Sequence, residues 1–223
     1  MFDGRVVDEL DLLQAWHQGD QVAGAALFEQ YYPSVARFFR NKVSDVAQED
    51  LIHETFLGCL NRAAQVREQA RFRTFLFSVA HRVLADHWRR TYRRAERLDD
   101  AIDVDLVAST SYELAPVANL VQEEEQRLVL EALRRIPVLH QVALELYYWE
   151  ELTAAEIGEV LGIPLATAKT RLRDGRLYLE DQIRRIGHSL ESLQSTLDNL
   201  DLWARRVRAQ VSPPADVASQ APR

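Results

Sequence analysis

The sequence lacks the features on which disulfide-rich, membrane-spanning and secreted proteins depend. Cys59 is the only cysteine among 223 residues, so no internal disulfide can form, as is typical of a reducing compartment. No apolar run approaches the roughly 18 residues that a membrane span needs, and the acidic N-terminus lacks the pattern of a signal peptide. Only 8 glycines and 7 prolines interrupt long segments of helical periodicity. We therefore expect a soluble, cytoplasmic, all-α protein.

Charge is distributed unevenly along the chain. The formal net charge of −7 argues at first against a nucleic-acid partner. However, Arg62–Arg97 contains ten arginines and three acidic residues, whereas Leu98–Val160 contains fourteen acidic residues and three arginines. Local basic faces, rather than the total charge, decide whether a protein binds phosphates. The charge pattern is therefore compatible with nucleic-acid binding.

Helical periodicity predicts two helical domains joined by a linker. The first domain covers residues 8–95, and the second covers residues 117–186, with a break at Pro137. Between them, residues 96–116 are acidic and show no sustained helical face, which is typical of a linker. In the first domain, the helices are expected over Glu9–His17, Gln21–Lys42, Ser44 to about Ala63, and Arg71 to about Tyr92.

The C-terminal part of the chain is expected to form an extension and a tail. Leu190–Val207 repeats apolar residues at three- and four-residue spacing, which predicts an amphipathic helix within residues 187–210. Packing onto the preceding domain and binding to a partner are equally compatible with this stripe. Residues 211–223 are expected to be disordered.

The segment Leu152–Arg176 has the pattern of a helix-turn-helix. Thr153 and Glu156 have the spacing of a capping box, which predicts where the first helix begins. Gly162 can adopt the left-handed conformation that ends a helix, and Pro164 resists its continuation. The small residues Gly158 and Ala168 stand where two such helices must pack closely.

The second helix of this pair is predicted to present a polar and basic face. Leu165, Ala168 and Leu172 are expected to face inward. Outward-facing residues are expected to be Thr167, Lys169, Thr170, Arg171, Arg173 and Arg176. Contacts in the major groove require cations and hydroxyls of this kind on a helix. A plain packing unit is the alternative interpretation of the same spacing.

A second basic segment interleaves arginines with aromatic residues over Arg71–Arg97. Arginine contacts phosphates, and exposed aromatic rings can stack on unpaired bases, so the segment suits partly single-stranded DNA. The alternative is that Phe72, Phe75 and Trp88 belong to the core while the arginines are simply solvated.

Metal-binding and catalytic interpretations have little support in the sequence. The six histidines are scattered without metal-ligand spacing, and no glycine-rich phosphate loop is present. Cys59 lies on an apolar helical face, where a small core residue is expected more than a nucleophile. We therefore expect no metal, no cofactor and no enzymatic activity.

Two separated sets of motifs stand out in the chain: Asp50–Phe56, Phe72–Ala80 and Ala85–Arg90 form the first, and Ala154–Leu172 forms the second. The first set resembles region two, and the second resembles region four, of the bacterial sigma factors of the sigma-70 type. The order of the motifs and the short connection between them are similar to the extracytoplasmic-function group. The resemblance covers about residues 20–95 and 120–186.

The resemblance implies an alternative sigma factor that binds core RNA polymerase and directs promoter recognition, melting and transcription initiation. Polymerase contacts, with the clamp helices of the largest subunit, would come from Asp50, Leu51, Glu54, Thr55 and Phe56. Contacts to the minus-ten element would come from Arg71, Arg73, Phe75, Arg82, Asp86, His87, Arg89 and Arg90. Contacts to the minus-thirty-five element would come from Thr167, Lys169, Thr170, Arg171, Arg173 and Arg176.

The resemblance also implies further partners and one location. The second domain would meet the flap region of the polymerase, and the acidic linker would follow the polymerase's RNA path. An anti-sigma factor is an additional candidate partner, and membrane insertion is not expected. The Leu190–Val207 helix lies beyond the part that resembles the family, and its docking on the chain's own domains or on another protein is a separate hypothesis. The protein would be associated with the nucleoid when it is bound to polymerase.

This sequence departs from the family pattern at three places. Arg82 stands where family members often have Asn, and His53 stands where they often have Gln. Asp174 and Gly175 interrupt what is usually a more basic run. A promoter sequence therefore cannot be transferred from the family.

Two other functions remain open from the sequence alone. A DNA-binding regulator could use the same helix-turn-helix as a dimer on a symmetric operator, without polymerase. A helical adaptor could instead act through the Leu190–Val207 stripe.

Overall fold

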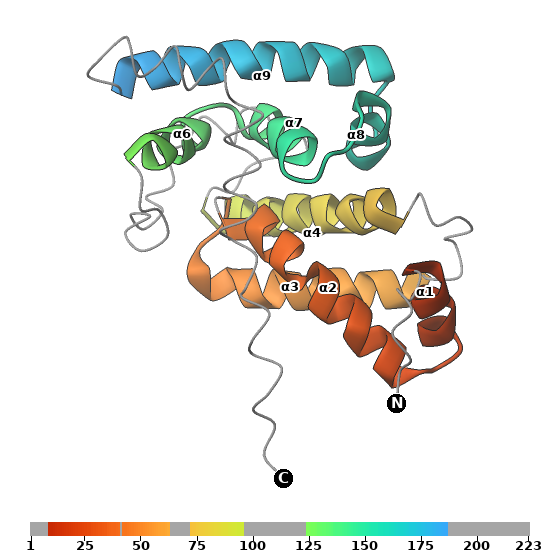
Figure 1. Ribbon diagram of the computed structural model, residues 1–223. Coiled ribbons are helices and arrows are strands. Elements are labelled where there is room, and N and C mark those ends of the chain that lie inside the picture. Colours follow the sequence, from red (N-terminus) through yellow and green to blue (C-terminus); the bar gives the residue numbers. More distant parts are fainter. Residues whose placement is uncertain (1–8, 41, 63–71, 96–123, 187–223) are drawn as a thin grey trace.

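The computed structural model describes residues 9–40, 42–62, 72–95 and 124–186, and all regular structure in these ranges is helical. The helices are α1 (Glu9–His17), α2 (Gln21–Arg40), α3 (Asp45–Arg62), α4 (Phe72–Ala95), α6 (Glu124–Arg134), α7 (Val138–Tyr148), α8 (Ala154–Leu161) and α9 (Leu165–Ile186). The all-α prediction is confirmed (Figure 1).

The first domain is a bundle of α1 to α4. Helix α2 begins after Asp20, whose Oδ1 accepts hydrogen bonds from the backbone N–H groups of Val22 and Ala23 at 2.8 and 3.2 Å. Helix α1 packs on α2, and α3 packs on both α2 and α4. Large aromatic side chains, including Phe39, Phe72 and Phe77, are fully buried between these helices.

The second domain consists of α6 to α9. Pro137 separates α6 from α7 as the sequence predicts, because it stands at the N-cap of α7 with an extended backbone (φ −55°, ψ 133°). Helix α9 packs on α6, α7 and α8, and Figure 1 shows it lying along one side of all three. Leu144, Leu146 and Ile157 are fully buried in this domain.

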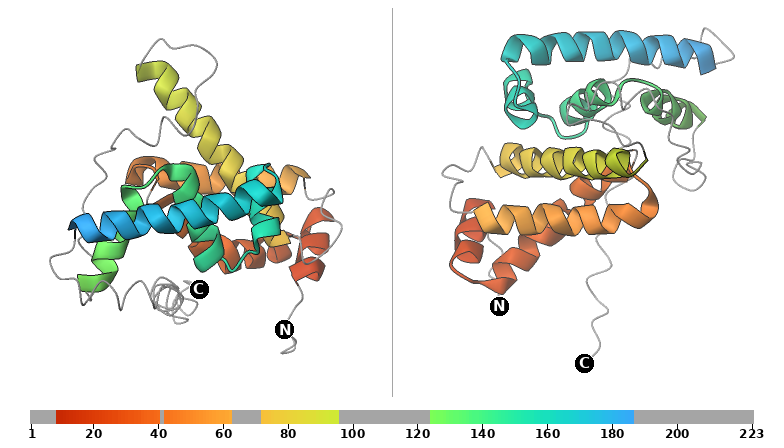
Figure 2. Two further views of the ribbon diagram at one scale, coloured as in Figure 1. Left: turned by 90° about the horizontal axis from the view of Figure 1, so that it is seen from above. Right: turned by 180° about the vertical axis from the view of Figure 1, so that it is seen from behind.

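The two domains are in direct contact through α4. This helix packs on α3 of its own domain and on α8 of the second domain, so it lies between the two. Figure 2 shows the same layering from behind and shows α9 crossing over α4 when viewed from above. The buried apolar residues of both domains form one continuous cluster.

The helix bounds agree closely with those predicted from the sequence. Helix α1 and the end of α9 at Ile186 match, and α2, α3 and α4 differ from the predicted ends by one to three residues. The predicted linker (96–116), the extension (187–210) and the tail (211–223) lie outside the described residues. No described helix combines the length and apolar character that crossing a bilayer requires.

Candidate nucleic-acid interface

Helix α8 begins at a complete capping box. The backbone N–H of Glu156 donates to Thr153 Oγ1 at 3.3 Å, and the backbone N–H of Thr153 donates to Glu156 Oε2 at 2.7 Å. These two bonds satisfy amide groups that a helix N-terminus otherwise leaves unpaired. Gly162 ends the helix with φ 65°, the left-handed conformation that the sequence predicted.

The turn between α8 and α9 depends on a close approach at Gly158. A Cβ atom at this position would lie 2.9 Å from the carbonyl oxygen of Ile163 and 3.8 Å from Ala168 Cβ. The prediction that small residues allow close packing here is therefore confirmed. Ala168 and Leu172 are buried as expected, but Leu165 is 46% exposed and does not face inward. Leu165 is the first residue of α9, where the helix has not yet reached the core.

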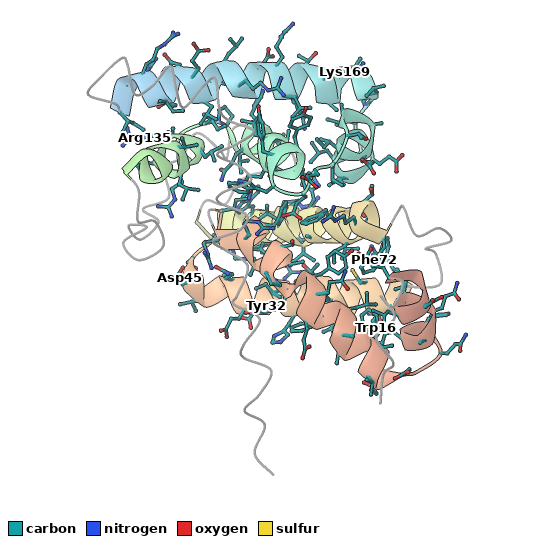
Figure 3. All side chains as sticks on the ribbon, viewed as in Figure 1. Trp16, Tyr32, Asp45, Phe72, Arg135 and Lys169 are labelled. Carbon is teal, nitrogen blue, oxygen red and sulfur yellow. The ribbon has the colours of Figure 1, made fainter. Side chains whose placement is uncertain are left out.

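The predicted outward face of α9 is present. Thr167, Lys169 and Thr170 are exposed on its first two turns, followed by Arg173. Figure 3 places Lys169 near the end of α9 that adjoins α8. Arg173 forms an ion pair with Asp174 at 2.9 Å, so part of its charge is already neutralised. Arg171 is half-buried and lies close enough to His81 of α4 to affect its ionisation.

Arg176 makes a different set of contacts from the other residues of this face. Its Nε donates to the hydroxyl oxygen of Tyr148 at 2.9 Å. Its guanidinium carbon lies 5.2 Å from the ring centroid of Tyr147 and 5.6 Å from that of Tyr148. These distances fit cation–π interactions. Arg176 therefore joins α9 to α7, and the sequence analysis did not identify either tyrosine as its partner.

Gly175 explains the interruption of the basic run in α9. It is buried against α7, where an added Cβ would lie 3.2 Å from Leu144 Cγ and 3.4 Å from His140 Cβ. A larger residue would push the two helices apart. One side of the second half of α9 is therefore a packing surface against α7, and on its exposed side Arg184 and Arg185 pair with Glu180 and Asp181.

The residues predicted to contact the minus-ten element divide between exposed and partly covered positions on α4. Arg71 lies outside the described residues. Exposed positions are Arg73, Arg82, Arg89 and Arg90, and half-buried positions are Phe75, Asp86 and His87.

Several of these α4 arginines already contact protein groups. Arg89 pairs with Asp86, and Arg90 lies 3.6 Å from Glu54 of α3. Arg73 donates to the backbone carbonyl of Glu150 at 3.3 Å. Burial, followed by the nearby charge of Arg90, lowers the pKa of His87, which favours its neutral form at neutral pH.

The large aromatic residues of α4 are mostly core residues. Phe72 is 1% exposed and Trp88 is 5% exposed. The indole N–H of Trp88 donates to the carbonyl of Lys42 at 3.3 Å. The alternative interpretation of the basic aromatic segment is therefore correct for these two rings. Phe75 and His87, which are half-buried, are the aromatic groups that retain access to solvent among the candidates.

The segment predicted to contact polymerase is a helix with one buried and one exposed side. Leu51, Thr55 and Phe56 are buried, and the Thr55 hydroxyl donates to the carbonyl of Leu51 at 2.8 Å. A direct contact by these three side chains would require α3 to move. Asp50 and Glu54 are exposed.

The exposed side of α3 includes two residues that the sequence analysis did not choose. Asp50, His53, Glu54 and Leu57 follow the spacing of one helix face, and Leu57 is 59% exposed. The His53 ring stacks on Phe28 of α2 at 6.4 Å between centroids, and Phe28 contacts Tyr32 at 5.3 Å. Tyr32, which is labelled in Figure 3, is 39% exposed. The α3 face consists of these exposed residues, and a search for exposed apolar residues at helical spacing could have found Leu57.

No described part of the chain gathers three or more His, Cys, Asp or Glu side chains into a group that could hold a metal ion.

Two family models match the chain, one in each domain. The model of sigma-70 region 2 matches residues 27–94, which comprise most of α2 together with α3 and nearly all of α4. The model of sigma-70 region 4 matches residues 126–179 and includes the helix-turn-helix.

Proteins named as RNA polymerase sigma factors are similar to this chain. The sigma factor YlaC of Bacillus subtilis is 28% identical over 155 residues, covering 69% of this chain and 88% of that protein. The extracytoplasmic-function sigma factor SigW of the same species is 25% identical over 177 residues, covering 75% and 92%. The chain belongs to the extracytoplasmic-function group of the sigma-70 family.

Two more comparisons define how far this similarity extends. The probable RNA polymerase sigma factor RfaY of Xanthomonas campestris pv. campestris is 26% identical over 182 residues, and the match spans 45% of its length. Among solved structures, CnrH in complex with the cytosolic domain of CnrY matches with a TM-score of 0.57 and 18% identity. That match covers 81% of this chain and 99% of CnrH, and it supports the fold.

The sigma factor therefore has region two in α2 to α4 and region four in α6 to α9. Sequence reasoning identified both regions and the basic face of α9. The structure adds the contacts of Arg176 with Tyr147 and Tyr148, and it adds the exposed side of α3.

Proposed function

We propose that this sigma factor holds a promoter at two places while it is bound to core RNA polymerase. Region four contacts the minus-thirty-five element, region two contacts and melts the minus-ten element, and the α3 face binds the clamp helices of the largest subunit. The polymerase carries out the chemistry, and the factor supplies none. The observation that carries the proposal is the presence of both matched regions on one chain, with an exposed polar and basic face on α9.

The first half of α9 suits the major groove. In a helix-turn-helix the N-terminal residues of the second helix reach the base edges. Thr167, Lys169 and Thr170 occupy these turns and are exposed. The lysine can contact phosphate or guanine, and the hydroxyls can donate to or accept from base edges. Arg171 follows and can contribute a bidentate contact to guanine.

The side chains of helix α4 are suited to binding one strand of melted DNA. Arg82, Arg89 and Arg90 are exposed and can contact phosphates along one strand. Extracting a base from the stack costs a few kcal/mol, which stacking and hydrogen bonds in a pocket must offset. Phe75 and His87 are the half-buried aromatic groups that can contribute to such a pocket.

The α3 face combines acidic and apolar groups, as a surface for a protein partner requires. Asp50 and Glu54 supply negative charge, and Leu57 supplies an apolar side chain that is 59% exposed. Aromatic and apolar anchors surrounded by charged residues are common in protein interfaces. We place the clamp-helix contact here rather than at the buried Leu51, Thr55 and Phe56.

Three other proposed partners follow from the family: region four meets the flap region, the acidic linker follows the RNA path, and an anti-sigma factor regulates access. A regulatory role for the predicted Leu190–Val207 helix is a separate proposal, because that segment lies beyond the part of the chain that matches the family. The factor acts in the cytoplasm and is associated with the nucleoid when bound to polymerase.

Run-off transcription with core polymerase tests the proposal. We expect promoter-specific transcripts, followed by start-site mapping to define both elements. Lys169→Ala should weaken binding at the upstream element, whereas Arg135→Ala on α6, whose partner Glu131 lies on the same helix at 3.0 Å, is the matched control. A purified factor that never binds core polymerase, but binds a symmetric operator as a dimer, would instead establish an independent regulator.

A further inference from the structure

The exposed arginines of α9 differ in whether a carboxylate of the protein neutralises them. Arg173, Arg184 and Arg185 each form an ion pair with an acidic residue of the same helix. Arg176 is also exposed, but it forms no ion pair with any carboxylate in the part of the chain that the structure describes. A cation without such a partner can bind an anion without first giving up an intramolecular pair.

Two tyrosines of α7 fix the position of the Arg176 guanidinium. Its Nε donates to Tyr148 Oη at 2.9 Å, and its central carbon lies 5.2 and 5.6 Å from the ring centroids of Tyr147 and Tyr148. The two rings are nearly perpendicular, at 88°, with their centroids 5.0 Å apart. Burial alone would lower the pKa of Arg176, but the two tyrosine hydroxyls raise it above its ordinary value, so both hydroxyls act on this cation. A side chain that is already ordered loses less entropy when it binds a partner.

The position of Arg176 leaves hydrogen-bond donors for an anion. A guanidinium has five N–H groups, and the bond to Tyr148 uses the one on Nε. The N–H groups on Nη1 and Nη2 form a planar fork, which matches two oxygens of a phosphate. An oxyanion of this geometry is therefore the ligand for which the Arg176 side chain is best suited.

Arg176 lies on the side of α9 that also presents Lys169 and Arg173. The three residues follow one another at spacings of four and three, which places them on one helix face, and all three are exposed. From Lys169 to Arg176 the helix advances about 10 Å, at about 1.5 Å per residue. The major groove is about 12 Å wide. A helix whose first turns reach the base edges therefore brings a group about 10 Å further along to the sugar-phosphate backbone.

We propose that Arg176 binds a backbone phosphate of duplex DNA beside the upstream element, and that Tyr147 and Tyr148 are positioning residues that hold its guanidinium in the orientation for this contact. The inference rests on the proposed function, in which α9 contacts the upstream element. It assigns a phosphate rather than a base to Arg176, so the contribution of Arg176 to affinity is independent of the DNA sequence. The first two turns of α9 read the bases, and the pair of tyrosines on α7 serves the backbone contact.

Equilibrium binding of the holoenzyme to a duplex that carries the upstream element, measured at several KCl concentrations, tests this inference. Arg176→Gln removes one phosphate contact and should reduce the slope of log affinity against log salt by about 0.9. At any one salt concentration its affinity should fall about tenfold, and by the same factor on a scrambled duplex. The matched control is Arg185→Gln, which removes the same charge from the same helix. Because Arg185 already pairs with Asp181 at 2.9 Å, this control should change neither the slope nor the affinity.

Two conservative variants keep the charge and test the positioning. Arg176→Lys retains a cation but lacks the planar fork, so the salt slope should stay as in the wild type while the affinity falls about threefold. Tyr148→Phe removes the hydroxyl that accepts the bond from Arg176 Nε, and it should likewise keep the slope and lower the affinity about threefold. Circular dichroism and the unfolding midpoint establish that each variant is folded before its binding is measured.

Neutral methylphosphonates, placed one at a time along the duplex, identify the phosphate. One substitution beside the upstream element should weaken binding of the wild type about tenfold and should not weaken binding of Arg176→Gln any further. An unchanged salt slope in Arg176→Gln, or methylphosphonates that weaken both proteins equally at every position, overturns the inference and leaves Arg176 as a contact between α7 and α9 only.

Failure of the proposed function has a different signature. A wild-type holoenzyme that yields no promoter-specific transcript contradicts the proposed function. Salt slopes of the free full-length chain on duplex DNA then decide the inference by themselves, because a slope that is lower in Arg176→Gln than in Arg185→Gln supports a phosphate contact, and equal slopes overturn it.

Discussion

Helices α4 and α9 both carry cations and both are candidates for contacting DNA, but the protein covers them to different extents. Helix α4 is packed between α3 and α8, and its first residue, Phe72, is 1% exposed. Helix α9 is packed on one side, and its first residue, Leu165, is 46% exposed. A basic helix that is covered on two sides uses many of its cations for contacts inside the protein. A helix covered on one side keeps a continuous face for a partner.

The largest expected effect is on the free energy of unfolding, and it compares the first residue of α4 with the first residue of α9. Phe72→Ala should lower the free energy of unfolding by about 3–5 kcal/mol, because it leaves a cavity between α2 and α4. Leu165→Ala should change it by less than about 0.5 kcal/mol, because the side chain is largely in water. Denaturant titration of both variants measures the two changes. Equal losses would show that α9 begins in the core as α4 does.

The second prediction concerns Arg171 on α9. Arg171→Ala should weaken binding of the holoenzyme to the upstream element by roughly 1–3 kcal/mol, through loss of a base or phosphate contact. Footprinting over that element measures the change. Arg135→Ala, on α6, should leave the footprint as it is in the wild type. An unchanged footprint with Arg171→Ala would argue against assigning the upstream contact to α9.

The third prediction concerns the pH dependence of the contact between the two domains. Burial, assisted by the charge of Arg171, lowers the pKa of His81 to about 4 from an ordinary value of 6.5. The unfolded chain therefore takes up this proton at a higher pH than the folded chain. The stabilising contribution is complete above pH 6.5 and is lost as the pH falls toward 4.

Thermal unfolding at several pH values tests this prediction. At about pH 5.5, one unit below 6.5, the loss should be about 1.4 kcal/mol, since one pKa unit corresponds to about 1.4 kcal/mol. His81→Gln should flatten the pH dependence between pH 6.5 and 4, whereas His17→Gln, at an exposed position, should leave it in place. An identical pH profile for the wild type and His81→Gln would exclude His81 as its source.

The smallest effect on the free energy of unfolding is expected for the hydrogen bond between Arg176 and Tyr148. Tyr148→Phe removes the hydroxyl that accepts the 2.9 Å hydrogen bond but keeps the ring. The loss should be about 0.5 kcal/mol, because the bond is exposed to solvent. Introducing Arg176→Ala into the wild type and into the Tyr148→Phe variant isolates the contribution of this bond in a double-mutant cycle. Additive losses would show that the bond does not stabilise the α7–α9 contact.

Local signals made the helices of this protein predictable. The capping box of Thr153 and Glu156, the left-handed Gly162 and the break at Pro137 each act within a few residues, so the sequence alone places them. The outward position of Lys169 could also be predicted, because Ala168 and Leu172 define the buried side of α9.

Packing between distant segments could not be predicted in the same way. The motif over Asp50–Phe56 does not show that Leu51 and Thr55 are buried, because α3 packs on both α2 and α4. Lys42 and Glu145 are 103 positions apart and have no local signature of their pairing. The need for a glycine at position 175 likewise depends on α7, which lies beside Gly175 only in the folded chain.

The close contact at Gly175 also has an evolutionary consequence. It divides α9 into a first half that bears exposed polar residues and a second half that is fixed against α7. If α9 contacts DNA as proposed, substitutions at Thr167, Lys169 and Thr170 would alter which DNA is bound with little effect on folding, because these side chains are exposed. Duplicated copies of such a gene could therefore acquire new promoter preferences through a few changes in the first two turns, while the remainder of the helix stays under constraint.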